Sequence, residues 1–197
     1  CYSTPMQKVI FIDLDGTVTP DSTWFHLNLR LGITKEEDKA LFDQYLDQKI
    51  EYNTWTKELY KIHVNRGSIT KDELELFAEE LILRPDAIET ILSMKQKGYR
   101  VVLLSGSVDL IVSVIAKRIG ADDWRACLQF VFVNGILSDI TSSGDEAEAK
   151  IAIAQKYLEE HTISTENCIA VGDGGNDIEL FKTMKGVLVG DNQKLKP

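Results

Sequence analysis

Four short segments of the chain carry side chains whose types and spacing could do chemistry. In chain order they are Asp13-Leu14-Asp15-Gly16-Thr17, Ser105-Gly106-Ser107, Lys150 and Gly172-Asp173-Gly174-Gly175-Asn176-Asp177. Together they supply two spaced carboxylates, hydroxyl groups, one cation and a second acidic pair. This set predicts phosphoryl transfer through an aspartyl-phosphate, because a carboxylate can attack phosphorus while a metal and a cation balance the charge on its oxygens.

The first segment pairs two carboxylates at the end of a predicted buried strand. Asp13 ends the strand, where a carboxylate is costly without a partner or a chemical role. Asp15 follows two residues later and, in strand-like geometry, points to the same side. Gly16 permits a sharp turn, and Thr17 can donate a hydrogen bond. The alternatives are an Asp-rich helix cap or a calcium loop, but the next three residues lack the alternating acids of such a loop.

The last segment pairs Asp173 with Asp177 after another apolar run. If a helix begins near Asn176, both carboxylates lie at its entrance, where their oxygens suit Mg²⁺ held partly by water. The alternative is a glycine-rich loop whose acids only cap the helix.

The other two segments are weaker signals when taken alone. Ser105 and Ser107 flank Gly106 at a predicted strand end, where hydroxyl and backbone N–H groups would bind phosphate oxygens. Serine after a strand is otherwise an ordinary helix cap. A lone lysine on a helix is ordinarily a solvated charge, so only the other three segments place Lys150 at the site.

Apolar runs that alternate with helical stretches predict a parallel sheet covered on both faces, an α/β fold of Rossmann-like type. The expected strands are residues 8–12, 101–104, 168–171 and 187–189, and the expected crossover helices are residues 85–98, 108–119 and 145–161. Residues 128–140 contain Asn134-Gly135 between apolar runs, which indicates a hairpin. Polar groups at the carboxyl ends of parallel strands meet at one edge, which brings the four segments together.

Residues 20–84 interrupt this alternation and are predicted as a helical insert. The expected helices are residues 22–31, 35–49, 52–65 and 70–81, and Thr34 with Glu37 and Thr70 with Glu73 form capping-box patterns. The predicted domains are a core of residues 1–19 and 85–197 and a small helical cap of residues 20–84. Because the insert follows the first acidic segment, it can lie above the site. Trp24, Phe25 and Trp55 fit the core of this cap or the wall of a substrate pocket.

Composition limits the classes of partner. The 197-residue chain is 44% hydrophobic and has a net charge of −9, which disfavours a nucleic-acid partner. Three cysteines without a close pair, no zinc pattern and no membrane-spanning run predict a cytoplasmic protein with no membrane partner. The histidines at positions 26, 63 and 161 have no spacing typical of a metal site and are interpreted as structural or surface residues.

In order and separation, the four segments resemble the motifs of the haloacid dehalogenase superfamily of phosphatases, over nearly the whole chain. The last segment and the insert after the first strand are similar to the phosphoserine phosphatase-like subfamily, which has a small helical C1 cap. The chain stops at Leu195-Lys196-Pro197, where relatives usually continue with a further strand and helix. That difference predicts a shortened or minimal version of the core.

The resemblance implies a Mg²⁺-dependent phosphomonoester hydrolase that acts on a small phosphorylated metabolite, with phosphoserine as one candidate. Asp13 would attack phosphorus, and Asp15 would protonate the leaving alcohol and then activate water. The implied metal residues are Asp13, Asp15 through its backbone carbonyl, Asp173 and, in a supporting role, Asp177. The implied phosphate-binding residues are Thr17, Ser105, Gly106, Lys150 and Asn176.

Two departures concern the substrate. Phosphoserine phosphatases usually carry a glutamate at the position of Ser22, and here only the neighbouring Asp21 is acidic. The cap arginine that would hold a substrate carboxylate has Arg66 as its candidate. Asp21, Trp24 and Arg66 are therefore the expected substrate contacts in the cap.

Three other functions use similar residues. A phosphotransferase would pass the phosphoryl group from the same site to an acceptor alcohol. A signalling receiver domain also phosphorylates an aspartate, but it does so after a later strand and lacks a helical insert. A binding module with a degenerate site is disfavoured by the intact acids and lysine of the four segments.

Overall fold

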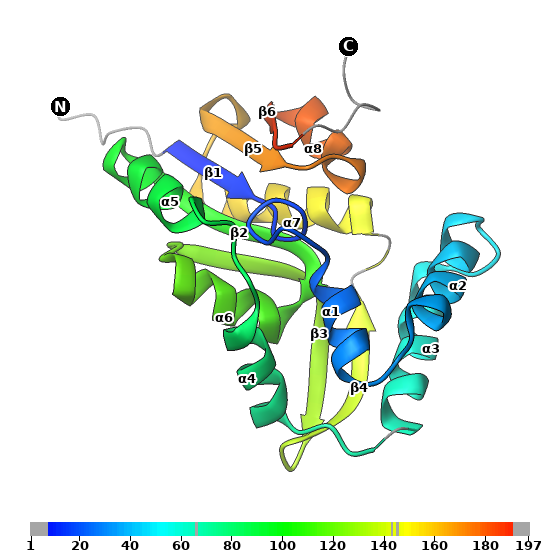
Figure 1. The fold of residues 1–197 in the computed structure, drawn as a ribbon. Coiled ribbons are helices and arrows are strands. Elements are labelled where there is room, and N and C mark those ends of the chain that lie inside the picture. Colours follow the sequence, from blue (N-terminus) through cyan, green and yellow to red (C-terminus); the bar gives the residue numbers. More distant parts are fainter. Residues whose placement is uncertain (1–7, 66, 143, 145, 191–197) are drawn as a thin grey trace, which may run out of the picture.

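A six-stranded sheet forms the centre of the molecule, in the order β4-β3-β2-β1-β5-β6 (Figure 1). The computed structural model describes residues 8–65, 67–142, 144 and 146–190. The strands are β1 Lys8–Ile12, β2 Tyr99–Val108, β3 Asp123–Val133, β4 Ile136–Ser142, β5 Cys168–Gly172 and β6 Lys185–Leu188. All neighbouring strands are parallel except β3 and β4, which form an antiparallel hairpin.

Helices cover both faces of this sheet, as the alternation of apolar runs predicts. On one face lie α5 (Ala87–Gln96) and α6 (Asp109–Ile119), and on the other lie α7 (Glu146–His161) and α8 (Ile178–Thr183) (Figure 1). Each face buries its own hydrophobic cluster because the strands present apolar side chains to both sides. The α/β fold class is confirmed. No helix among the described residues is long and apolar enough to cross a bilayer.

Several element boundaries differ from the sequence expectation. Strand β2 continues through Ser105-Gly106-Ser107, and its pairing with β3 shifts register between Ser105 and Val108. The serine segment is therefore the irregular end of a strand rather than the loop after it. The hairpin turn lies at Asn134 and Gly135, both with positive φ, but β3 begins earlier than residue 128. The last strand is Lys185–Leu188 instead of 187–189.

Four helices form the insert: α1 (Thr23–Arg30), α2 (Lys35–Leu46), α3 (Tyr52–Asn65) and α4 (Lys71–Glu80). Both capping boxes are present, since the Thr34 and Thr70 side chains accept hydrogen bonds from the Glu37 and Glu73 N–H groups. The segment from 47 to 49, expected as the end of the second helix, lies beyond α2, because Gln48 has a positive φ.

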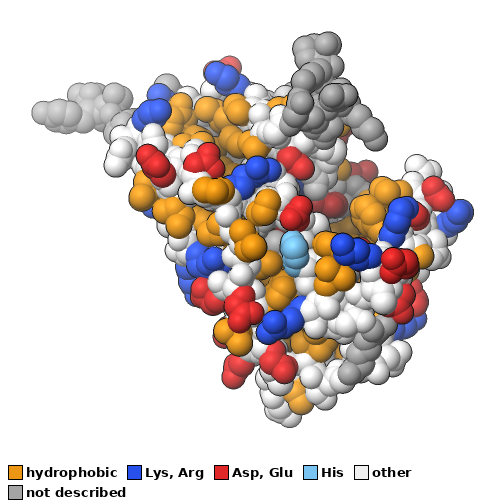
Figure 2. Space-filling model, viewed as in Figure 1, with side chains coloured by type: hydrophobic (Ala, Val, Ile, Leu, Met, Phe, Trp, Pro, Cys, Tyr) orange, Lys and Arg blue, Asp and Glu red, His pale blue; other side chains and the backbone are white. Residues whose placement is uncertain are grey.

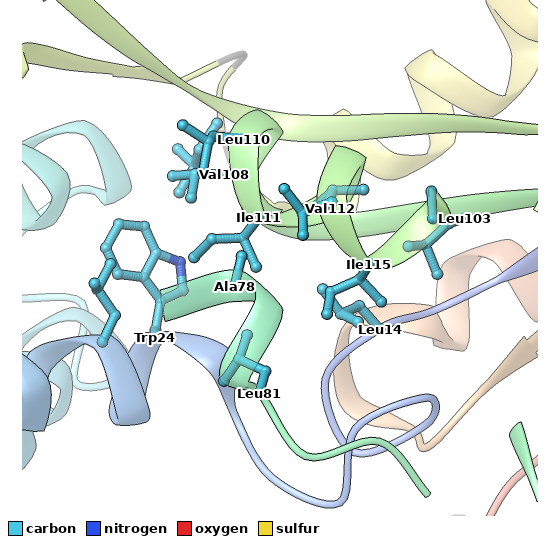
Figure 3. Packing of buried hydrophobic residues seen from close by; sticks show 14 of the residues in the cluster. Leu14, Trp24, Ala78, Leu81, Leu103, Val108, Leu110, Ile111, Val112 and Ile115 are labelled. Atoms are coloured by element: carbon cyan, nitrogen blue, oxygen red, sulfur yellow. The ribbon is translucent and has the colours of Figure 1, made fainter. Parts of the chain in front are cut away.

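The insert shares one hydrophobic core with the sheet. Figure 3 shows Ala78 of α4 and Leu81, the residue that follows α4, facing Ile111 and Ile115 of α6. The Arg118 guanidinium of α6 donates to the Ala78 and Leu81 carbonyls at 2.8 and 2.9 Å. On the other side, α3 packs on β4 of the long hairpin. Helix α4 is thereby attached to the core, and α2 lies at the outer end of the insert (Figure 1).

Candidate active site

Three of the four sequence segments meet around one buried lysine. The Lys150 ammonium of α7 donates to Asp13 Oδ1 at 2.7 Å and to Asp177 Oδ1 at 2.9 Å. The lysine side chain has 0% exposure, and those of Asp13 and Asp177 have 4% and 2%. Backbone pairing continues past the strand, since the Asp13 N–H donates to the Val171 carbonyl of β5 at 2.8 Å. The carboxyl ends of β1 and β5 thus fix where the carboxylates stand.

Asp13, Asp173 and Asp177 form a cluster that could hold a metal ion. One carboxylate oxygen from each lies within 4.8 Å of the others. Asp177 Oδ2 is buried and has no hydrogen-bond partner among the described residues, which leaves an oxygen for a cation. The Asp15 carboxylate does not belong to this cluster. If Asp15 contacts the metal, it would do so through its backbone carbonyl.

The electrostatics of the cluster favour an added cation. Burial raises the pKa of Asp13 well above its usual value, and Lys150 only partly opposes this while Asp177 adds to it. Burial and Asp177 also raise the pKa of Asp173. For Lys150, burial alone would lower the pKa, but the neighbouring Asp13 and Asp177 raise it above its usual value, so the side chain is an ammonium. Three carboxylates around one ammonium leave an excess of negative charge that suits Mg²⁺.

Asp15 is held by the first turn of the insert. Its Oδ1 accepts from the Thr23 N–H at 2.8 Å, and its Oδ2 accepts from the Thr23 hydroxyl at 3.2 Å. Burial raises the pKa of Asp15 to about 6, against the lowering effect of these two hydrogen bonds. A carboxyl with this pKa can exist in both protonation states near neutral pH, as an acid and base requires.

The expected phosphate-binding residues lie around the same point but differ in their contacts. Ser105 is fully buried, and its hydroxyl accepts from the Ser107 N–H at 3.0 Å. The Thr17 hydroxyl is buried and has no hydrogen-bond partner among the described residues. Asn176, in the short 3₁₀ turn η2 (Gly175–Asp177), donates its side-chain N–H to Glu146.

Glu146 is the site residue that the sequence analysis missed. A Cβ added to Gly106 would collide with its carboxylate, so the two residues are in close contact. Its charge also contributes to raising the pKa values of Asp15 and Lys150. The signal was available, because Glu146 precedes Lys150 by four residues, and residues at that spacing share one face of a helix.

A cleft of about 710 Å³ opens beside these groups, between the sheet edge and α1 to α3. Its inner end is lined by Asp15, Gly16, Gly106, Glu146, Ala147, Asp173, Gly175 and Asn176. Its outer wall is lined by Pro20, Asp21, Ser22, Trp24, Phe25, Asp38, Phe42, Tyr45, Leu46, Tyr52 and Trp55. Figure 2 shows hydrophobic and acidic side chains gathered at the hollow between the α2 end of the molecule and the sheet.

The three substrate contacts expected in the cap differ in where the structure places them. Asp21 lines the cleft with an exposed side chain that lies 3.6 Å from the His26 ring. Trp24 lines the cleft but is only 9% exposed, and Figure 3 shows its indole nitrogen turned toward Ala78 of α4 and Ile111 of α6. Arg66 lies outside the described residues.

Comparison with known proteins assigns the family. The model of the haloacid dehalogenase-like hydrolase family matches residues 7–184. The chain belongs to this family. The receiver-domain alternative is thereby excluded, and the expected enzyme class, a hydrolase of this family, is confirmed.

Individual relatives of this hydrolase carry the name phosphoserine phosphatase. That of Methanocaldococcus jannaschii is 28% identical over 180 residues, which cover 89% of this chain and 82% of the relative. That of Archaeoglobus fulgidus is 26% identical, and the match covers 87% of this chain but only 48% of the relative. A solved structure described as a phospho-aspartyl intermediate analogue of phosphoserine phosphatase has a TM-score of 0.76 and 26% identity. The match covers 93% of this chain and 86% of the solved one, so the resemblance to this subfamily is confirmed.

Proposed function

We propose that this hydrolase cleaves a small phosphomonoester through an aspartyl-phosphate on Asp13. The observation that carries the proposal is the buried contact of Lys150 with Asp13 and Asp177 beside the carboxylate cluster. A nucleophile, a cation and a metal-binding group are held at one point, which is what phosphoryl transfer requires. Phosphoserine phosphatase relatives support a small phosphorylated substrate.

In the first step, an Asp13 carboxylate oxygen bonds to phosphorus as the bond to the leaving alcohol breaks. The second Asp13 oxygen stays on the Lys150 ammonium, which fixes the orientation of the carboxylate. Asp15 gives its proton to the departing alkoxide. Since burial raises the pKa of Asp15 to about 6, enough of the acid form is present near neutral pH.

In the second step, the ionised Asp15 takes a proton from water, which attacks phosphorus and releases Asp13 and phosphate. The Thr23 N–H and hydroxyl hold the Asp15 carboxylate in place for both steps. Ser105, the Gly106 N–H, Thr17 and Asn176 are the proposed donors to the phosphoryl oxygens.

Mg²⁺ would be held by Asp13, Asp173 and Asp177, whose oxygens converge and include one, Asp177 Oδ2, that has no hydrogen-bond partner in the described part of the chain. A bound Mg²⁺ neutralises charge on the phosphoryl oxygens and so stabilises the transition state.

The proposed cap consists of residues 20–84, which would exclude water and select small alcohols. Its two connections to the core meet at the first motif, because the Arg84 N–H donates to the Val18 carbonyl at 2.8 Å. The Arg84 guanidinium also donates to the Gly16 carbonyl at 2.7 Å. These two hydrogen bonds and those of Arg118 join residues 78–84 to the core, so opening the cleft by bending at 19–20 and 84–85 would require them to break. A cytoplasmic location, suited to the buried Cys168 thiol, belongs to the same proposal.

Phosphate release from p-nitrophenyl phosphate tests this function. Turnover should need Mg²⁺, should stop with EDTA and should return when Mg²⁺ is restored. An added alcohol that accepts the phosphoryl group and lowers phosphate release in proportion would instead identify a phosphotransferase. Activity that persists in EDTA would contradict the metal assignment.

A Gly16→Ala variant should lose Mg²⁺ affinity. Gly16 has φ +74°, and a Cβ there would overlap the Asp173 carboxylate, so alanine must displace a proposed metal ligand. We expect Mg²⁺ to bind about ten-fold or more weakly, as after other disturbances of groups that orient a metal ligand. Titration of the substrate-free wild-type and Gly16→Ala proteins with Mg²⁺ by calorimetry measures this difference.

Gly120→Ala is the matched control. Gly120 has φ +72° and no atom within 4 Å of an added Cβ, so this variant has the same backbone strain of about 1–2 kcal/mol without a collision. Equal Mg²⁺ affinity in the two alanine variants would show that Mg²⁺ binding does not depend on the present position of the Asp173 carboxylate.

A further inference from the structure

The outer wall of the cleft is built from aromatic side chains. The Trp55 ring centroid lies 5.4 Å from that of Tyr52, 5.9 Å from that of Phe42 and 6.0 Å from that of Tyr45. All four residues line the cleft, and Phe42 is 41% exposed at its mouth. Tyr52 and Trp55 are only 6% and 5% exposed, so a ligand group beside this cluster meets chiefly the Phe42 and Tyr45 rings, which favour an apolar or cationic group.

The charged residues of the same wall are acids. Asp21 and Asp38 line its outer part, while no lysine or arginine among the described residues lines the cleft. The position at which relatives usually place a glutamate is Ser22, whose hydroxyl instead caps α1 by accepting from the Phe25 N–H. A leaving group with its own carboxylate would therefore meet two acids and aromatic rings, with no lysine or arginine among the described lining residues. The Lys35 ammonium lies outside this lining, 5.5 Å from the Phe25 ring centroid.

Asp38 is held in the cleft by a chain of polar side chains that crosses three helices. The Asn28 amide of α1 donates to Asp38 Oδ1 of α2. Asn28 Oδ1 in turn accepts from His63 Nε2 of α3 at 2.7 Å. Asn28 has 0% exposure and His63 1%, so this chain is a buried support for one carboxylate. Its effect is to hold a negative charge near the aromatic wall.

On the basis of the proposed phosphatase activity, we propose that the leaving alcohol carries a cationic, alkylated ammonium head and no carboxylate. The phosphate end lies at Asp13 and Lys150, and the head lies against Phe42 and Tyr45, which pack on Trp55, with Asp38 as its counter-charge. Aromatic faces attract a desolvated quaternary ammonium, and a fixed carboxylate adds to that attraction. Phosphocholine has this chemistry.

The experiment compares four substrates on the wild-type protein with Mg²⁺. Phosphocholine tests the cationic head, and 3,3-dimethylbutyl phosphate is its uncharged isostere. Phosphoserine tests a head with a carboxylate, and p-nitrophenyl phosphate reports the basic activity. We expect kcat/KM for phosphocholine to exceed that for the isostere by about ten-fold. Phosphoserine should be poorer than both.

Two variants locate the recognition. Asp38→Asn should reduce the ratio of kcat/KM between phosphocholine and its isostere by about three-fold or more, and Phe42→Leu should reduce it as well. Glu36→Gln is the matched control, since it also removes one acid from the first turn of α2 but does not line the cleft. Its ratio should equal that of the wild type. The ratio between two substrates is insensitive to partial unfolding.

The outcomes separate this inference from the proposed function. The cationic head alone is overturned if p-nitrophenyl phosphate is hydrolysed but kcat/KM for the uncharged isostere equals that for phosphocholine. The same holds if phosphoserine is the best of the substrates. An Asp38→Asn ratio equal to that of the wild type also overturns the cationic head alone. No hydrolysis of any of the four substrates overturns the phosphatase proposal itself.

Discussion

Replacing Asp13 with asparagine should reduce kcat by several thousand-fold or more, roughly the cost of removing a covalent nucleophile in other enzymes. An amide oxygen carries no charge and forms no stable acyl phosphate. The variant should nevertheless fold, because asparagine has nearly the same shape and Lys150 keeps its contact with Asp177. The measurement is single-turnover phosphate release from p-nitrophenyl phosphate with saturating Mg²⁺.

The same change should leave stability in EDTA equal or increased. Burial raises the pKa of Asp13, so its ionised form is costly in the folded protein, and a neutral side chain relieves that cost. Thermal unfolding of both proteins in EDTA tests this point. Asp43→Asn, at an exposed acid of α2 that does not line the cleft, is the control and should retain turnover of p-nitrophenyl phosphate within a few-fold. Near-normal turnover of Asp13→Asn would overturn the covalent mechanism.

The sequence predicts the inner end of the site well because its residues follow strands. Asp13 and Asp173 come directly after apolar runs, and the carboxyl ends of parallel strands meet at one edge whatever the details of packing. The helices of the insert were also predictable from capping boxes and helical spacing. These are local signals that a few neighbouring residues carry.

Other features depend on contacts between distant parts of the chain. Lys150 lies in a helical stretch rich in charged and small residues, where periodicity alone indicates a solvated lysine, yet it has no exposed surface. The hydrogen bonds that link the side chains of Asp38, Asn28 and His63 join three helices, and no spacing along the sequence indicates them. The continuation of β2 through Gly106 requires the pairing with β3, which lies later in the chain.

A Lys150→Met variant should lose both activity and stability. Methionine fills much of the same volume but leaves the Asp13 and Asp177 carboxylates buried without their cation. Removing one member of a buried ion pair costs about 3–5 kcal/mol in the free energy of unfolding. Activity should fall by about a hundred- to a thousand-fold, the range for removing one group that stabilises transition-state charge. Urea unfolding in EDTA and phosphate release measure the two effects.

The loss of stability should depend on pH in a definite direction. Lys150 lowers the pKa of Asp13. Without Lys150, the pKa of Asp13 in the folded protein lies still further above its pKa in the unfolded chain. The folded variant then binds more protons than the unfolded one, and its stability falls as pH rises. The difference from wild type should shrink at mildly acidic pH and on addition of Mg²⁺. Lys156→Met, on the same helix with a 77% exposed side chain, should change stability by no more than about 0.5 kcal/mol. If both methionine variants lost equal stability at every pH, the cost would come from α7 itself, and Lys150 would not be the cation that holds the carboxylates together.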